Sequence, residues 1–253
     1  MTVIAVTSSR TSPGATSLAA GLALALSADY ERTLLIEADP AGGVLSLRFD
    51  LDVTPSLTTF GSDTRNGYSH ELAWRNTQDL RGVRCIPGPV DPRLARSWVE
   101  RVTPALTENL KTLGAPAIID LGWIAESGPS LSLAAAADVT LVVTRPEIAE
   151  VQALLFQVRQ LQAAGATVGL VTVGTAPNDP QEVAAVAGIP LVAVLPDDAA
   201  VAAALCGGKF APNKFRRSLL WRTIGGIASS LVDSGLMLSR ATNDEPAADL
   251  SAQ

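Results

Sequence analysis

Short runs of valine, isoleucine and leucine recur along the chain, and they alternate with stretches of helical periodicity. The runs cover residues 3–7, 34–37, 83–86, 117–121, 139–144, 168–173 and 191–195. Helices are predicted over about residues 15–28, 92–112, 147–164 and 180–187. Strands that are apolar on both faces are typical of buried parallel sheets. The alternation therefore predicts an α/β fold, with a doubly wound, mostly parallel sheet and helices on both faces.

Two segments interrupt this pattern. Residues 50–80 are rich in Asp, Thr, Ser, Asn and Gly and have weak periodicity, so they predict a surface excursion with one short helix near 69–74. Residues 241–253 are polar and acidic, which predicts a disordered acidic tail. Because no repeat or linker divides the remainder, we expect residues 1–240 to form a single domain.

Composition excludes several classes of protein. The net charge of -6 excludes a globally basic nucleic-acid-binding protein, although it leaves room for a local basic patch. Cys85 and Cys206 stand far apart in the sequence, and His70 is the single histidine. We therefore expect no zinc site, no iron–sulfur cluster and no disulfide framework. The cysteine pattern is typical of a protein of the reducing cytoplasm.

The segment after the first strand has the layout of a phosphate-binding loop. Small residues follow Thr7, and a helix rich in alanine and leucine begins near Ala15. In such a loop the backbone N–H groups and the helix N-terminus face an anion. Gly14 and Thr16 match the end of the usual G-x-x-x-x-G-K-[ST] pattern, but Ala15 stands in place of the lysine. A plain β-turn-α connection therefore remains the alternative.

Carboxylates follow two other predicted strands. Glu37 and Asp39 are two positions apart, so their side chains point the same way and are suited to hold magnesium or orient water. The alternative is that Glu37 caps a helix and Asp39 begins an Asp-Pro turn. Asp120 ends an apolar strand before Gly122, as a Walker B aspartate does. Its alternative role is to cap the exit from the strand.

These three signals occur in the order found in the ParA/MinD family of deviant-Walker-A P-loop ATPases, which the chain resembles over about residues 2–235. The family carries K-G-G-x-G-K-T-[TS] after its first strand. The segment RTSPGATS places Arg10 at the signature lysine and Ala15 at the loop lysine. LLIEADPAGG is similar to the family's LLIDxDPQGN, AIIDLGW to its Walker B segment, and GIPLVAVLPDD to its nucleotide-base loop.

The resemblance implies roles for particular residues. Asp39 and Asp120 would be catalytic, and together with Thr16 they would hold magnesium. Contacts with ATP would come from Arg10, Thr11, Ser12, Gly14, Ala15, Thr16, Ser17, Pro196 and Asp198. The family also implies a homodimer that binds a protein cargo or regulator.

Departures from the family pattern bear on activity. Ala15 replaces the lysine that contacts the phosphates, Thr11 and Ser12 replace glycines, and Pro13 removes a backbone donor. A charge-assisted phosphate contact contributes roughly 1.5–3 kcal/mol. Its loss predicts about 10- to 100-fold weaker nucleotide binding and impaired or absent hydrolysis. We hypothesise that Arg10 contacts the phosphates of the partner in a dimer; the alternative is a solvated surface arginine.

The residues therefore favour a positioning or partition protein for chromosome, plasmid, division site or pilus machinery, with a degenerate phosphate loop. Septum-site and pilus-assembly relatives make a bacterial, cytoplasmic protein at the pole or division site the expectation. The alternative is a pseudo-ATPase scaffold that binds a protein partner without nucleotide. A metabolic relative, such as an iron–sulfur carrier or an amidotransferase-linked synthetase, is disfavoured because the cysteine pair and a glutaminase-like region are missing.

A basic stretch precedes the acidic tail. No acidic residue occurs between positions 199 and 232, where the basic residues are Lys209, Lys214, Arg216, Arg217 and Arg222. The apolar face predicted for a final amphipathic helix is Phe215, Leu219, Ile224, Ile227 and Leu231. Non-specific DNA and an acidic protein are the candidate partners, and a solvated helix is the alternative. Membrane binding is not expected, because anionic lipid would repel the acidic tail.

Overall fold

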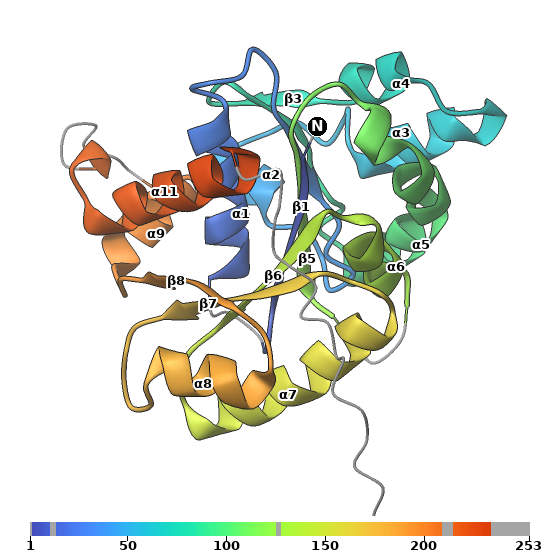
Figure 1. The fold of residues 1–253 in the computed structure, drawn as a ribbon. Helices are drawn as coiled ribbons and strands as arrows, with labels where there is room; N and C mark the ends of the chain where they lie inside the picture. Colours follow the sequence, from blue (N-terminus) through green and yellow to red (C-terminus); the bar gives the residue numbers. More distant parts are fainter. Residues whose placement is uncertain (1, 11–13, 125–127, 209–214, 234–253) are drawn as a thin grey trace, which may run out of the picture.

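The computed structural model describes residues 2–10, 14–124, 128–208 and 215–233, and within these ranges eight strands form one sheet (Figure 1). The strands are β1 (Val3–Ser8), β2 (Leu34–Glu37), β3 (Gln78–Leu80), β4 (Val83–Ile86), β5 (Ala117–Trp123), β6 (Val139–Thr144), β7 (Val168–Val173) and β8 (Leu191–Leu195). Their order is β3-β4-β2-β5-β1-β6-β7-β8, and every neighbouring pair is parallel except β3–β4. The predicted parallel sheet is confirmed, and β3 is an addition that the sequence pattern missed.

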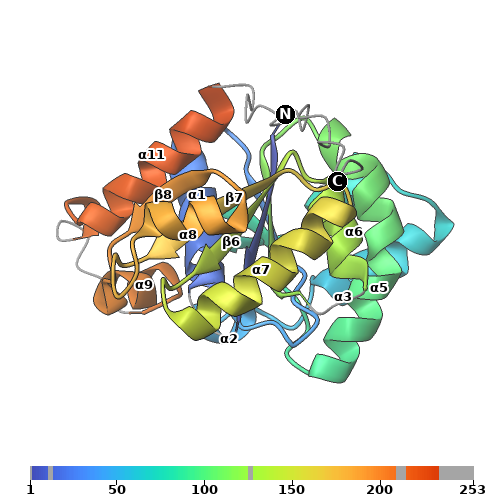
Figure 2. The same cartoon turned by 60° about the horizontal axis from the view of Figure 1, so that its bottom comes forward.

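Helices cover both faces of the sheet, as predicted (Figure 2). They are α1 (Ala15–Leu26), α2 (Leu45–Phe49), α3 (Leu57–Asp63), α4 (His70–Arg75), α5 (Pro92–Asn109), α6 (Pro129–Ala136), α7 (Ile148–Ala163), α8 (Pro180–Ala187), α9 (Ala199–Leu205) and α11 (Leu219–Asp233). Single 3-10 turns occupy Thr64–Asn66 and Leu110–Thr112. α1, α9 and α11 lie on one side, while α3 and α5 to α8 lie on the other.

Strand β1 shows why both sides need cover. All six of its residues are buried, and successive side chains point to opposite faces of the sheet. Val3 and Ala5 belong to the core beneath α5 and α7, whereas Ile4 and Val6 belong to the core beneath α1 and α11. A strand that is apolar on both faces therefore requires a helical layer on each side. Because the chain passes from β1 to α1, the carboxyl end of β1 lies near the start of α1.

Residues 50–80 do not form the surface excursion that their polar composition predicts. The predicted short helix is confirmed as α4, but this segment also forms α3 and β3. Leu57 and Phe60 are fully buried, because α3 packs against α5. The sequence pattern missed this burial, since two large apolar side chains are enough to anchor a short helix among polar neighbours.

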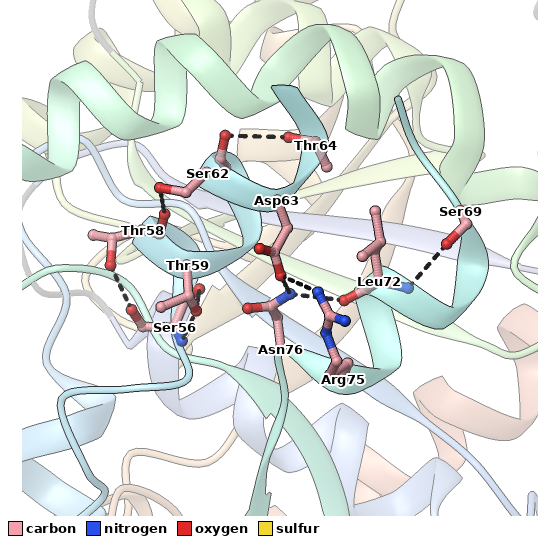
Figure 3. Close-up of polar contacts among 11 residues, drawn as sticks. Ser56, Thr58, Thr59, Ser62, Asp63, Thr64, Ser69, Leu72, Arg75 and Asn76 are labelled. Carbon is pink, nitrogen blue, oxygen red and sulfur yellow. Dashed lines mark hydrogen bonds and ion pairs between the residues drawn. The ribbon is translucent and has the colours of Figure 1, made fainter. Parts of the chain in front are cut away.

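The polar side chains of this segment satisfy one another locally (Figure 3). Ser56 and Thr59 form a capping box at the start of α3. Asp63 accepts hydrogen bonds from Arg75 Nη2 at 2.8 Å and Asn76 Nδ2 at 2.9 Å, which ties the end of α3 to the end of α4. The polar residues that made this segment resemble a loop thus cap and link its helices.

The last helix differs by one position from the predicted apolar face. Leu219 is 58% exposed and Leu220 is 5% exposed, so Leu220 takes the inward position that the sequence assigned to Leu219. Ile224, Ile227 and Leu231 are buried, as predicted, and so is Phe215 just before the helix. The exposed arginines of the predicted basic patch are Arg216, Arg217 and Arg222, whereas Lys209 and Lys214 lie outside the described residues.

The predicted tail of residues 241–253 also lies outside the described residues, and the division into one domain and a tail stays a prediction. Among the helices of the described ranges, none combines the length and the apolar character that crossing a bilayer requires.

Candidate functional site

The carboxyl ends of β1, β2 and β5 meet at one edge of the sheet, where α1 begins. Glu37 at the end of β2 lies directly across from Asp120 on β5. Gly14 enters α1 with φ of 107°, a left-handed conformation that favours glycine. The side chain of Thr16, in the first turn of α1, interacts with Asp120. The structure thus brings together Thr16 and Asp120, two residues that the sequence singled out.

Asp120 is a buried carboxylate that can accept a further hydrogen bond. It is 1% exposed, and its Oδ1 accepts a hydrogen bond from the Gly122 N–H at 3.1 Å. Its Oδ2 has no hydrogen-bond partner among the described residues. Burial raises the pKa of Asp120, while the Thr16 side chain, the Gly122 N–H and the positive charge of Arg48 lower it. A buried carboxylate oxygen without a partner is suited to accept a further donor or to bind a cation.

Glu37 is engaged in holding the chain that follows it. Its Oε1 accepts the N–H groups of Val44 at 2.6 Å and Leu45 at 2.9 Å, and its Oε2 accepts the Gly88 N–H at 2.9 Å. Burial, with the negative charge of Asp120, raises the pKa of Glu37 to about 7 against the effect of these three donors. Glu37 therefore caps the start of α2, which is the alternative role that the sequence left open for it.

Asp39 lies beside the end of β5 and is half-buried. Its Oδ1 accepts the Ala41 N–H at 2.7 Å, so it forms the turn expected of an Asp-Pro pair. The pKa of Asp39 is raised to about 6, mainly by burial. The Ala41 N–H lowers this pKa, and the negative charge of Asp120 raises it. A methyl group on Gly122 would overlap the Asp39 carboxylate, so glycine is required at that position.

A cavity of about 540 Å³ opens beside the start of α1. Four residues predicted to contact nucleotide line it together, namely Gly14, Ser17, Pro196 and Asp198. Much of its lining is apolar, namely Leu18, Val173, Leu195, Leu205, Leu220 and Ile224. A mostly apolar pocket with a few polar groups is typical of a site for a small-molecule ligand or cofactor.

Several charged side chains line the cavity, and they differ in the contacts that they already make. Arg145 Nη1 forms an ion pair with Asp197 at 2.7 Å. Asp198 accepts the Val201 N–H at 3.0 Å and so caps α9. Arg48 also lines the cavity. Neither arginine is among the site residues predicted from the sequence, and the three-dimensional arrangement brings them to the cavity.

The other predicted site residues have separate positions. Arg10 is exposed beyond the end of β1 and does not line the cavity. Ala15 is 6% exposed in the first turn of α1. Thr11 and Ser12 lie outside the described residues. Within the described ranges, no three His, Cys, Asp or Glu side chains form a group that could hold a metal ion by themselves.

Known structures were compared with this fold. A ParA family ATPase from Chlorobium tepidum TLS is 18% identical with a TM-score of 0.75, over 90% of this chain and 97% of its own. MinD from Pyrococcus horikoshii OT3, the septum site-determining protein solved with Mg-ADP, is 22% identical with a TM-score of 0.75, over 92% and 97%. The MinC:MinD cell division complex of Aquifex aeolicus contains a chain 17% identical with a TM-score of 0.71, over 92% and 96%.

No protein-family model matches the chain, and no curated protein sequence matches it either. At 17% to 22% identity the three solved structures establish the fold. The chain therefore has the fold of the ParA/MinD P-loop ATPases.

Proposed function

We propose that this chain is a ParA/MinD-type positioning protein that binds a nucleotide with magnesium through a weakened phosphate loop. The observation that supports this most is the convergence of Thr16, Asp39 and Asp120 at the sheet edge next to the 540 Å³ cavity. Gly14 and Ser17 connect the two, because they belong to the loop and also line the cavity. Phosphates at the loop and a base in the cavity would then be held by one continuous surface.

The residues present fit a magnesium ion. The buried Asp120 Oδ2 without a partner, the Thr16 hydroxyl and the half-buried Asp39 are oxygen ligands of the kind that Mg²⁺ prefers. Mg²⁺ usually keeps waters and phosphate oxygens among its ligands, so it does not need three protein carboxylates. When bound, the ion would neutralise charge on the phosphates and on these carboxylates.

Hydrolysis is proposed to be weak or absent. The loop lysine of related ATPases contacts the phosphates, and Ala15 offers only a methyl group there. The loss of one charge-assisted contact costs roughly 1.5–3 kcal/mol of binding. The same contact would be missing from the transition state of phosphoryl transfer, where positive charge is most needed.

A homodimer and a protein partner complete the proposal. Arg10 is exposed next to the loop, which leaves it free to reach the nucleotide of a second copy. The MinC:MinD complex supports a protein regulator for proteins of this fold. The exposed Arg216, Arg217 and Arg222 are proposed to attract an acidic partner or non-specific DNA in a salt-dependent way.

Calorimetry of Mg-ATP and Mg-ADP binding, at low and high protein concentration, tests this proposal. Wild-type protein is expected to bind, while Asp39→Ala and Asp120→Asn bind more weakly. Asp29→Ala, at an exposed aspartate after α1, is the matched control and should bind like the wild type. If the site is completed by a dimer, the affinity for Mg-ATP should be higher at the high protein concentration. In Arg10→Ala this difference between the two concentrations should disappear.

The runner-up is a pseudo-ATPase scaffold, and the observation that favours it is Ala15 in place of the loop lysine. Absence of binding up to millimolar Mg-ATP would contradict the nucleotide proposal and support the scaffold. The decisive measurement for a scaffold would then be nucleotide-independent association with a protein partner.

A further inference from the structure

We propose that Arg48, on α2 of the same chain, supplies the positive charge that Ala15 no longer brings to the nucleotide phosphates. This inference rests on the proposed nucleotide site and names one residue that makes such a site workable. The loop lysine of related ATPases comes from the first turn of the helix after the loop. In this chain the charge would come instead from the last turn of α2, 33 positions further along.

Arg48 has the right surroundings for this role. It lines the same cavity as Gly14, which precedes α1, and Ser17, in the first turn of α1. Its charge also reaches Asp120, at the sheet edge where magnesium and phosphates are proposed to bind. The phosphate end of a bound nucleotide would therefore lie within reach of the Arg48 charge.

Arg48 is also available for a ligand. Among the described residues that line the cavity, the arginines are Arg48 and Arg145. Arg145 is paired with Asp197 through two contacts, at 2.7 and 3.3 Å. Arg48 is exposed and forms no ion pair within 4.0 Å with a residue that the structure describes. An anion entering the cavity would thus find one arginine occupied and the other open.

The fold holds α2 at both ends, so the position of Arg48 is built in. At the start of α2, the Glu37 carboxylate accepts the N–H groups of Val44 and Leu45. At its end, the Arg48 carbonyl lies so close to Gly207 that a Cβ there would overlap it. These contacts order the helix before any ligand binds, which lowers the entropy cost of using its side chain.

A second set of contacts fixes the end of α2. Arg81 stacks over the Phe49 ring at 5.2 Å and donates a hydrogen bond to the Ala204 carbonyl at 3.1 Å. It therefore links α2 to α9, which forms part of the cavity wall. A five-residue helix would not hold its shape alone, and these contacts explain how it can present a functional side chain.

Arginine suits the chemistry. Its planar guanidinium stays charged and donates paired N–H groups to phosphate oxygens, a geometry that a lysine ammonium cannot reproduce. This contact is made within one chain, so it does not depend on dimerisation. The proposed contact of Arg10, made across a dimer, does depend on it, and the two are therefore separable by protein concentration.

The test is Mg-ATP and Mg-ADP binding by the full chain at one low and one high protein concentration. Arg48→Gln is expected to lower affinity about 10- to 100-fold at both concentrations, the effect of losing one charged phosphate contact. Arg48→Lys keeps the charge but loses the paired N–H groups, so its affinity is expected to lie between those of the wild type and Arg48→Gln. Arg159→Gln, at an exposed arginine on α7, is the matched control and should not change affinity.

The outcomes separate this inference from the proposed function. If wild-type protein binds Mg-ATP and Arg48→Gln binds equally well, the role of Arg48 is overturned while the nucleotide site stands. If affinity falls only at high protein concentration, the contact is made across a dimer, and the inference is likewise overturned. If the wild type itself does not bind, the nucleotide site and the role of Arg48 are both overturned. Thermal unfolding of Arg48→Gln alongside Arg159→Gln shows whether folding contributes to a loss.

Discussion

The carboxylate of Asp39 lies directly against the α-carbon of Gly122, although the two residues stand on different strand ends. Gly122 adopts φ of 58° and, through its N–H, also donates a hydrogen bond to Asp120. Its carbonyl accepts a hydrogen bond from the Thr7 hydroxyl at 2.8 Å. Gly122 thus lies where the carboxyl ends of β1, β2 and β5 meet, at the sheet edge where the site is proposed.

Gly122→Ala should destabilise the protein for two reasons, backbone strain and overlap with Asp39. A side chain in the left-handed region costs about 1–2 kcal/mol, and overpacking adds about 1–3 kcal/mol. Gly114→Ala is the matched control, because φ is 74° there and no atom lies within 4 Å of the added Cβ. Urea unfolding of both variants checks this. Equal losses of unfolding free energy would show that Asp39 does not need the space at Gly122.

Stability should fall as pH rises towards neutrality, and Glu37 should be one cause. Its pKa is raised from 4.5 to about 7, so between these values the folded protein holds a proton that the unfolded chain releases. The contribution of Glu37 is therefore present at low pH and is lost as pH rises through that interval. The raised pKa of Asp39, from 3.8 to about 6, acts in the same direction.

Urea unfolding of Glu37→Gln at several values between pH 4.5 and 7 measures this effect. The variant should show a shallower decline in unfolding free energy than the wild type, because glutamine does not titrate. Glu31→Gln, at an exposed glutamate, should keep the wild-type slope. An identical slope in all three proteins would mean that Glu37 releases its proton over the same pH range in the folded and the unfolded protein.

Ala15→Lys should strengthen Mg-ATP binding by about 10- to 100-fold, because it returns the charge that the loop has lost. Calorimetry gives the affinity, and a phosphate-release assay shows whether hydrolysis rises with it. Ala28→Lys adds the same charge at an exposed position after α1 and should change neither quantity. No gain in Ala15→Lys would indicate that the replacement of the lysine is not what weakens the loop.

Phe60→Ala should cost about 3–5 kcal/mol of unfolding free energy, the usual effect of emptying a fully buried phenylalanine site. The side chain is 0% exposed and its ring packs edge-on against Tyr68 at 6.3 Å. Val53→Ala, at a residue that is 88% exposed, should cost less than about 0.5 kcal/mol. Similar small losses in both variants would restore the view that residues 50–80 are a surface excursion.

The prediction from sequence was strongest where a pattern is repeated over a short span. The run at 3–7 is apolar at every position up to Thr7, and it forms a strand buried on both faces. In the same way, the aspartate in the run at 117–121 predicted a carboxylate near the carboxyl end of that strand, and Asp120 lies across from Glu37 there, although β5 continues to Trp123. The local hydrophobic pattern determines these strands, because a strand that is apolar on both faces is buried in the middle of a parallel sheet.

Prediction from the sequence failed where contacts between distant parts of the chain decide the structure. The choice between Leu219 and Leu220 depends on how α11 is rotated against α1, and helical periodicity alone leaves that phase uncertain by one residue. Helix α2 is too short to show periodicity and exists because Glu37 caps it. Neither feature can be recognised without the partners that lie on other elements.

The sequence by itself determined the parallel α/β architecture and the order in which the loop after β1, Asp39 and Asp120 follow their strands. Each of these depends on neighbouring residues along the chain. Only the tertiary structure decided that Glu37 supports α2, that Asp39 needs Gly122, and that Arg48 faces the cavity. The contact between Arg48 and Gly207 joins residues that are far apart in the sequence. Such contacts form only after the sheet has placed the elements, so no local pattern encodes them.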